Sequence, residues 1–220
     1  MYLENFYNMT KKERNKLLQP IAEDLGLYLN RDIAYKMIEL NGFKIILGLL
    51  FDTCSNKNMF RPYYFGQCLF IPNKFLTLSF GDTITHPCEN RTTDFWDIES
   101  YQIYKSLIYT KFLDFVGNTT SFKSFLNALV KRKYPYYSNE SNKAVICAYI
   151  NIILNNKKEA LSWLKIVIDE PNPRNLTFVE ERREQTIKIF NLLKTDNYAS
   201  IFEIFCQWQN ETINFLKLNL

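Results

Sequence analysis

The stretch that decides the fold is residues 33–52, which read IAYKMIELNGFKIILGLLFD. At its centre, Asn41-Gly42 is the strongest short-range signal for a two-residue β-hairpin turn. We therefore expect Ile33–Leu40 to form one strand and residues 43–52 to return as its antiparallel partner. Apolar residues fall on both faces of the second strand, so it should be central in its sheet and covered on both sides. They are Phe43, Ile45, Leu47, Leu49 and Phe51 on one face and Ile46 and Leu50 on the other.

A helix is expected before the hairpin. Thr10-Lys11-Lys12-Glu13 fits a capping box, in which the Thr and Glu side chains each accept a hydrogen bond from the other's backbone. Apolar residues recur at helical spacing up to Gly26, which is placed to end the helix. Pro20 lies inside this pattern and should kink or split the helix.

Two further strands are expected after the hairpin, over residues 63–71 and 75–80. The second alternates cleanly, with Leu76, Leu78 and Phe80 on the inward face. Together with the hairpin they predict an antiparallel meander of about four strands that closes at Gly81.

The back half has a helical period. After a polar loop over 82–94, a stripe of apolar residues runs from Ile98 through Tyr101, Tyr104, Ile108, Phe112 and Phe115 to a stop at Gly117. Further helices are expected over residues 119–130, 138–154, 157–169, 180–193 and 198–218, with Thr119 or Thr120 as the first cap. The fold class predicted is α+β: an N-terminal helix and antiparallel meander in residues 1–94, then an all-helical half in 95–220, packed as one compact unit.

The front part resembles a family of small bacterial α+β proteins of unknown function. The matching stretches of residues 10–81 are a leading helix that ends near Leu27, the 43–52 strand, Phe70-Ile71-Pro72 and the closing residues 76–81. Some members of that family look like immunity proteins, which bind and block a toxin. The resemblance covers under half of the chain and implies no catalytic residue.

Residues 144–171 resemble one helical hairpin of the tetratricopeptide kind. Ala160 follows a short Asn-Lys turn, and Pro171 follows the second helix. A true repeat should recur after 34 residues, but that position is Lys194. We therefore predict a layer of helical hairpins without a repeat array.

Composition narrows the class of protein. Apolar residues make up 47% of the 220, which excludes intrinsic disorder. The first residues lack a signal-peptide core, and the longest apolar run, residues 45–51, is far shorter than a membrane span. The five cysteines are odd in number and never in a CxxC pair, which is typical of reduced thiols. We expect a cytoplasmic protein with no membrane partner.

Few residues are placed for catalysis. His86, the single histidine, lies in a loop close to Cys88, and Cys54 and Cys68 are the other nearby thiols. Neither a Cys–His dyad nor a four-ligand zinc site follows from this spacing, so His86 is interpreted as an incidental loop residue and Cys68 as a buried one. Asp94, Asp97 and Glu99 could do acid–base work or bind Mg²⁺, but acids also stabilise the first turn of a helix, with Asp94 as its expected N-cap.

No phosphate-binding glycine loop or other common catalytic motif is present, and the chain has only six glycines. We therefore expect no metal, no cofactor and no enzymatic activity.

The most suggestive segment is Lys131-Arg132-Lys133-Tyr134-Pro135-Tyr136-Tyr137. Three cations followed by three tyrosines suit phosphate contacts and base stacking, or anchors for an acidic protein surface. The structural alternative is a helix C-terminus ended by Pro135. Arg182 and Arg183, among Glu180, Glu181 and Glu184, are interpreted as a solvated helix face with local ion pairs.

Charge divides unevenly along the chain. Residues 1–116 hold 13 basic and 13 acidic side chains, and residues 117–220 hold 14 and 10, so the net charge of +4 lies in the helical half. The function expected is a non-catalytic bacterial protein-binding module, such as an immunity or toxin-neutralising protein, with Lys131, Arg132, Lys133, Tyr134, Tyr136 and Tyr137 as candidate partner-binding residues. The alternatives are a nucleic-acid-associated protein using the same segment and an enzyme of unrecognised class.

Overall fold

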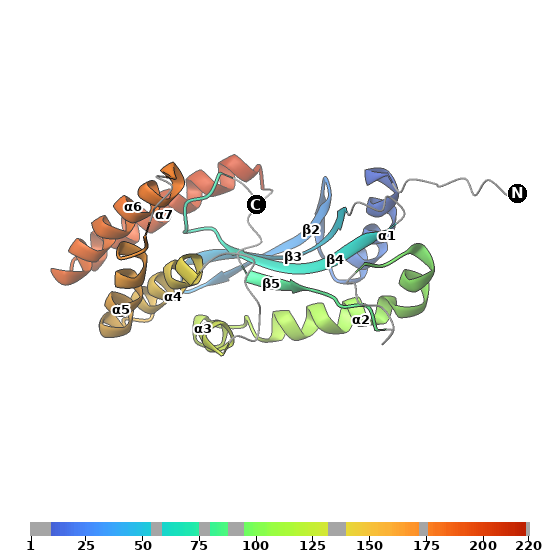
Figure 1. Cartoon of the computed structure of the whole chain (residues 1–220), viewed down its shortest axis with the longest axis horizontal. Helices are drawn as coiled ribbons and strands as arrows, with labels where there is room; N and C mark the ends of the chain where they lie inside the picture. The colour runs from blue at the N-terminus through green and yellow to red at the C-terminus, as the bar shows by residue number, and fades with distance from the viewer. Residues whose placement is uncertain are drawn as a thin grey trace, which may run out of the picture. The chain divides into compact units, whose positions relative to one another are not determined.

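The described part of the chain contains one antiparallel sheet and seven helices, seen in a computed structural model (Figure 1). It covers residues 10–53, 59–74, 80–87, 95–131, 140–171 and 176–218. The fold class is α+β, with an N-terminal helix, an antiparallel sheet and a helical C-terminal half, as predicted. The elements in order are α1 Lys11–Asp24, β1 Tyr28–Asn30, β2 Ile33–Leu40, β3 Phe43–Thr53, β4 Phe60–Cys68, β5 Phe80–Thr83, α2 Ile98–Gly117, α3 Phe122–Val130, α4 Glu140–Ile153, α5 Lys157–Ile168, α6 Thr177–Lys194 and α7 Tyr198–Leu216.

The sheet is a five-stranded meander in the order β1-β2-β3-β4-β5. The turn between β2 and β3 has positive φ at both Asn41 (50°) and Gly42 (81°), the conformation that a type I′ turn requires. Strand β3 is central, and its residues from Ile45 to Leu47 are fully buried, so the predicted position and double coverage are confirmed.

Three expectations about the sheet were wrong. The short edge strand β1 was missed; it pairs with the start of β2 through Tyr28 opposite Tyr35 and Asn30 opposite Ile33. Strand β4 begins three residues earlier than expected, at Phe60. The sheet does not close at Gly81, because that glycine lies inside β5. Of the strand predicted over 75–80, residues 75–79 with Leu76 and Leu78 lie outside the described residues.

The chain divides into two compact units, each built from several segments. The first contains residues 1–38, 46–66 and 81–118, and the second contains 39–45, 67–80 and 119–220. The strands therefore contribute residues to both units. Helix α2, which the sequence placed in the second part, belongs by its contacts to the first unit.

In the first unit, α1 and α2 begin at side-chain caps. Thr10 and Glu13 form the predicted capping box of α1. The helix then runs through Pro20 as one element of 14 residues, so the predicted split does not occur. Helix α2 is capped by Asp97, not by Asp94. Its predicted buried stripe holds at Tyr101, Ile108, Phe112 and Phe115, whereas Tyr104 is half-buried and Ile98, the first residue of the helix, is 52% exposed.

In the second unit, helices α3 to α7 pack successively against one another (Figure 1). Helix α4 is buried almost all round between Lys143 and Ile152, as the core helix of a helical layer should be. Its Tyr149 lies 4.8 Å from the ring of Phe205 and 6.0 Å from that of Trp208, both on α7. Helix α3 is capped by Ser121, one residue after the predicted Thr120.

Helix α7 also binds the sheet-derived segments of its own unit through two buried polar side chains. The Gln209 Oε1 accepts a hydrogen bond from the Lys44 backbone N–H at 2.6 Å. The Thr212 hydroxyl lies 3.4 Å from the Ile71 carbonyl, to which it donates. Within the described ranges, no helix has the length and apolar character that crossing a lipid bilayer requires.

Candidate functional site

The basic and aromatic segment predicted to bind a partner is described at one residue only. Lys131 is exposed and occupies the C-cap of α3, where its backbone N–H donates to the Asn127 carbonyl at 3.0 Å. Arg132, Lys133, Tyr134, Tyr136 and Tyr137 lie outside the described residues. The helix-terminus interpretation is therefore confirmed for Lys131, and the binding role of the segment stays a prediction.

The acidic residues before α2 act in helix capping. The Asp97 carboxylate accepts a hydrogen bond from the Ser100 backbone N–H at 2.7 Å, and Glu99 is exposed in the first turn. Asp94 lies outside the described residues. Asp97 thus has the N-cap role that the sequence had assigned to Asp94, because the helix begins three residues later than Asp94 would place it.

His86 is not an exposed loop residue. Its side chain is 4% exposed, and its ring lies 5.6 Å from that of Trp96 and 5.7 Å from that of Tyr104. The indole N–H of Trp96 donates to the Ile84 carbonyl at 2.9 Å, and this hydrogen bond holds the Trp96 ring in place beside His86. His86 therefore packs in the core of the first unit, while its sequence neighbour Cys88 lies outside the described residues.

Among the described residues, the cysteines and the other metal-binding residue types do not come together in a site. Cys68 is 1% exposed, as predicted, and burial raises the pKa of its thiol well above the ordinary value. Cys54 lies outside these ranges. No group of three or more His, Cys, Asp or Glu side chains placed to hold a metal ion occurs among the described residues.

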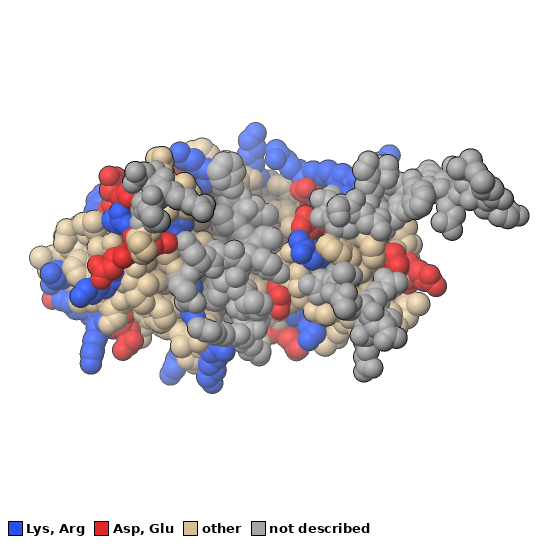
Figure 2. Space-filling view, in the orientation of Figure 1, with Lys and Arg blue, Asp and Glu red and all other residues tan. Residues whose placement is uncertain are grey.

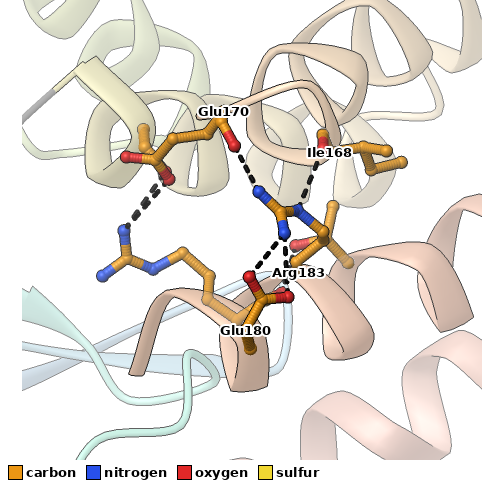
Figure 3. A network of polar contacts seen from close by, with 7 residues as sticks. Ile168, Glu170, Glu180 and Arg183 are labelled. Atoms are coloured by element: carbon orange, nitrogen blue, oxygen red, sulfur yellow. Dashed lines mark hydrogen bonds and ion pairs between the residues drawn. The ribbon is translucent and has the colours of Figure 1, made fainter. Parts of the chain in front are cut away.

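The most developed polar cluster joins the end of α5 to the start of α6, and it centres on Arg183 (Figure 3). The Arg183 Nε donates to the Ile168 carbonyl at 3.1 Å, and another guanidinium nitrogen donates to the Glu170 carbonyl. The third nitrogen binds both carboxylate oxygens of Glu180, at 2.7 and 2.8 Å. Arg183 therefore supplies a donor to the last carbonyl of α5, that of Ile168, which has no partner within the helix, and another donor to the Glu170 carbonyl just beyond it.

Arg182 extends the cluster toward α4. Its guanidinium donates to the Ser141 hydroxyl at 3.1 Å and lies 3.9 Å from the Glu170 carboxylate. Its side chain is only 21% exposed, and burial lowers the pKa of the guanidinium, while nearby Glu170 and Tyr149 oppose that shift. Arg182 also lies over the ring of Phe178, 5.8 Å from its centroid.

The cluster continues into the core through Thr186. The Thr186 hydroxyl donates to the Arg182 carbonyl at 2.8 Å and is also hydrogen-bonded with Tyr149. Tyr149 is buried, and this burial raises the pKa of its phenol. The polar groups thus connect α4, α5 and α6 in one continuous set of contacts.

The structure corrects the interpretation of Arg182 and Arg183 as a solvated face. The predicted local ion pair is present between Glu180 and Arg183, but both arginine side chains are mostly buried. The sequence does contain a signal for this role. The two arginines follow a segment with two prolines that ends the preceding helix. The last carbonyls of that helix need hydrogen-bond donors from outside it.

Two residues at the start of α6 were not predicted from the sequence. The helix was expected to begin at residue 180, whereas α6 begins at Thr177. Leu176 is 39% exposed and Phe178 is 54% exposed. The signal available was three apolar residues, Leu176, Phe178 and Val179, between two polar stretches. Figure 2 shows acidic and basic side chains interspersed over the surface of α5 to α7.

No protein-family model matches the chain, and comparisons with curated proteins and with solved structures give no match either.

Proposed function

We propose that this chain is a non-catalytic protein that binds another protein. The observation that supports the proposal is the set of large apolar side chains left exposed on the helices of the second unit. They are Val130, Ile166, Leu176, Phe178, Ile187 and Phe215. Single exposed apolar residues are ordinary in proteins, but Leu176 and Phe178 are both exposed at the start of α6, and Arg182 packs over the Phe178 ring.

The polar residues that were candidates for catalysis support the same proposal. Asp97 is used as a helix cap, and His86 is enclosed by aromatic rings. Arg182 and Arg183, which were not candidates for catalysis, likewise join helices. Each of these groups has a structural role that accounts for its position.

The finer proposal is an immunity or toxin-neutralising protein. It rests on the resemblance of residues 10–81 to a family with immunity-like members. A protein of this kind blocks its target by occupying it, so it needs a stable complementary surface and no chemistry of its own. The partner would then be a single protein bound in a stoichiometric complex.

The test is isolation of that complex from the native cell. The tagged full chain is recovered after growth under several conditions, and co-purifying proteins are identified by mass spectrometry. The identified partner is then purified separately and mixed with the chain, and the mass of the complex is measured by light scattering after size exclusion. We expect a stoichiometric complex. Recovery of no such partner under any condition would contradict the proposal.

The enzyme alternative is tested with variants that keep the fold. His86→Gln and Asp97→Asn retain polar groups at the two positions, and Asn is also an N-cap residue. We expect both variants to behave like the unmodified chain in the cellular assay that the partner defines.

A further inference from the structure

The tip of the β2–β3 hairpin places an exposed asparagine directly before an exposed glycine. These residues are Asn41 and Gly42, and φ is positive at both. Asparagine is a thermolabile residue, because the backbone nitrogen of the next residue can attack its side-chain carbonyl carbon. A side chain on that next residue hinders the attack, and Gly42 has none. Apart from its chain neighbours, no heavy atom of the described residues lies within 4 Å of a Cβ built on Gly42, so the space beside it is open.

Asn155 is an asparagine in a similar conformation that lacks these features. It is exposed and has a φ of 58°, close to the 50° of Asn41. The residue after it is Asn156, which has a side chain and whose backbone N–H donates to the Asn151 carbonyl at 2.8 Å. In the described part of the chain, no backbone carbonyl accepts a hydrogen bond from the Gly42 N–H. The nitrogen that would attack is therefore available at Gly42 and engaged at Asn156.

We infer that Asn41 is a site of spontaneous deamidation, with water as the co-reactant. The Gly42 nitrogen forms a bond to the Asn41 Cγ, the bond from Cγ to the side-chain nitrogen breaks, and that nitrogen leaves as ammonia with the proton of the Gly42 N–H. Water then opens the cyclic imide. Opening at the Cγ carbonyl gives aspartate, and opening at the backbone carbonyl gives isoaspartate, in which the main chain runs through the former side chain. This inference is independent of the proposed function.

The two products have different effects on the hairpin. Asp-Gly suits a type I′ turn as Asn-Gly does, so aspartate at residue 41 keeps the turn. Isoaspartate adds one carbon to the main chain of a two-residue turn, and the length of such a turn fixes the register of its strands. That register positions Lys44, whose backbone N–H donates to the Gln209 Oε1 of α7 at 2.6 Å. Residues 39–45 and α7 belong to the same unit, so isoaspartate loosens the attachment of the hairpin to α7.

The test follows the full chain during incubation in neutral buffer at physiological temperature. Trypsin releases residues 37–44 as one peptide, in which Asn41 is the single asparagine. Mass spectrometry measures the gain of one mass unit in this peptide, and electron-transfer fragmentation distinguishes aspartate from isoaspartate. Asn155 in the same samples is the internal control. Asn41→Gly is the control variant, because Gly-Gly also favours a type I′ turn but cannot deamidate.

We expect Asn41 to deamidate about tenfold faster than Asn155 or more, because the open nitrogen and the missing side chain both lower the barrier. Ion exchange separates the deamidated chain, which carries one more negative charge, and NMR then measures exchange of the Lys44 amide. This exchange should quicken by about threefold or more in the deamidated fraction. It should stay within about twofold of the fresh chain in Asn41→Asp, which has the aspartate product alone, and in incubated Asn41→Gly.

Two results would overturn the inference. Deamidation of Asn41 no faster than that of Asn155 would show that the folded turn protects its asparagine, and the modification site would be wrong. Exchange of the Lys44 amide that is the same in the deamidated fraction and in Asn41→Asp would show that the bond to Gln209 does not depend on the turn, and the effect on α7 would be wrong. Neither result depends on whether a protein partner is found.

Discussion

Gly81 allows β5 to lie close to β4, and the residues around it in the sequence do not indicate this role. It lies inside β5 with a φ of 145°, a conformation that residues with a side chain rarely adopt. A Cβ at this position would collide with the Tyr64 carbonyl oxygen and lie 2.8 Å from the Phe65 Cα. Both neighbours are backbone atoms of β4, so they cannot move aside as a flexible side chain would.

Gly81→Ala is therefore expected to destabilise the protein by more than about 3 kcal/mol, since backbone strain and overpacking add at one site. Urea unfolding followed by circular dichroism measures the change. Gly117→Ala is the matched control, because no heavy atom lies within 4 Å of a Cβ placed there. Equal stability of the two variants would show that β5 does not approach β4 as closely as described.

Gln209 is a second residue whose role depends on a partner distant in sequence. It is 7% exposed, and its Oε1 accepts from the Lys44 backbone N–H. Gln209→Leu removes the acceptor and leaves that N–H without its bond, so we expect a loss of about 1–3 kcal/mol in the free energy of unfolding. Gln207→Leu, at an exposed position two residues earlier, should change it by less than about 0.5 kcal/mol. Similar losses in the two would argue against this contact.

At the scale of the element, the capping box of α1 links helix stability to pH. Hydrogen bonds from the backbone and side chain of Thr10 lower the pKa of the Glu13 carboxyl. A lowered pKa in the folded state gives stability that is present above the ordinary pKa and lost as pH falls through the folded value. We expect the unmodified protein to lose stability from about pH 5 downward relative to Glu13→Gln, which keeps an acceptor but does not titrate. Parallel pH profiles of unfolding for the two proteins would contradict this.

The connection between α5 and α6 should open more easily when Arg183 is replaced. Arg183→Gln removes the donors to Ile168 and Glu170 and the charge opposite Glu180. Arg183→Lys restores the charge but not the planar set of donors, so it should recover only part of the loss. Amide hydrogen exchange near Ile168 and Val179 should quicken by about tenfold in Arg183→Gln. Glu184→Gln, on the exposed side of α6, should leave it unchanged, and exchange in α4 should stay slow in all three variants.

The elements that the sequence predicted well are those set by local patterns. The β2–β3 hairpin follows from Asn41-Gly42 and from the apolar residues beside it, and the start of α1 follows from the Thr10 and Glu13 pair. Strands β1 and β5 depend on pairing with neighbours, and they are too short to carry a period of their own. In the back half, α5 and α7 begin at the predicted residues 157 and 198, whereas α6 has no side-chain cap at Leu176 and begins three residues before the predicted start.

The candidate site was predictable only in part for the same reason. The pattern around Arg183 revealed its ion pair with Glu180, because that pair is separated by one helical turn. The bonds from Arg183 to Ile168 and from Arg182 to Ser141 join different helices, and no periodicity in the sequence reports them. Exposure of Phe178 is likewise a property of the packed helices and not of the residue type.

At the scale of the whole molecule, the distribution of charge separates protein binding from nucleic-acid binding. The excess of positive charge lies in residues 117–220, yet acids alternate with cations on α5 and α6, and the two arginines of α6 are mostly buried. A nucleic-acid surface needs exposed cations that neutralise several phosphates together. Lys131 is an exposed cation at the end of α3, whereas the exposed cations Lys11, Lys12 and Lys16 of α1 lie close together in sequence beside Glu13.

We therefore expect only weak, sequence-independent binding to RNA or DNA, with a Kd of about 10⁻⁴ M or weaker at physiological salt. The measurement is anisotropy of labelled 30-nucleotide RNA and DNA over a series of salt concentrations, for the unmodified chain and for a Lys131→Ala, Lys133→Ala double variant. Little difference should separate the two proteins, because the loss of two cations changes the number of released counterions by only about two. A tight complex with a steep salt dependence, which the double variant reduces for every sequence, would instead favour a nucleic-acid-associated protein that uses residues 131–137.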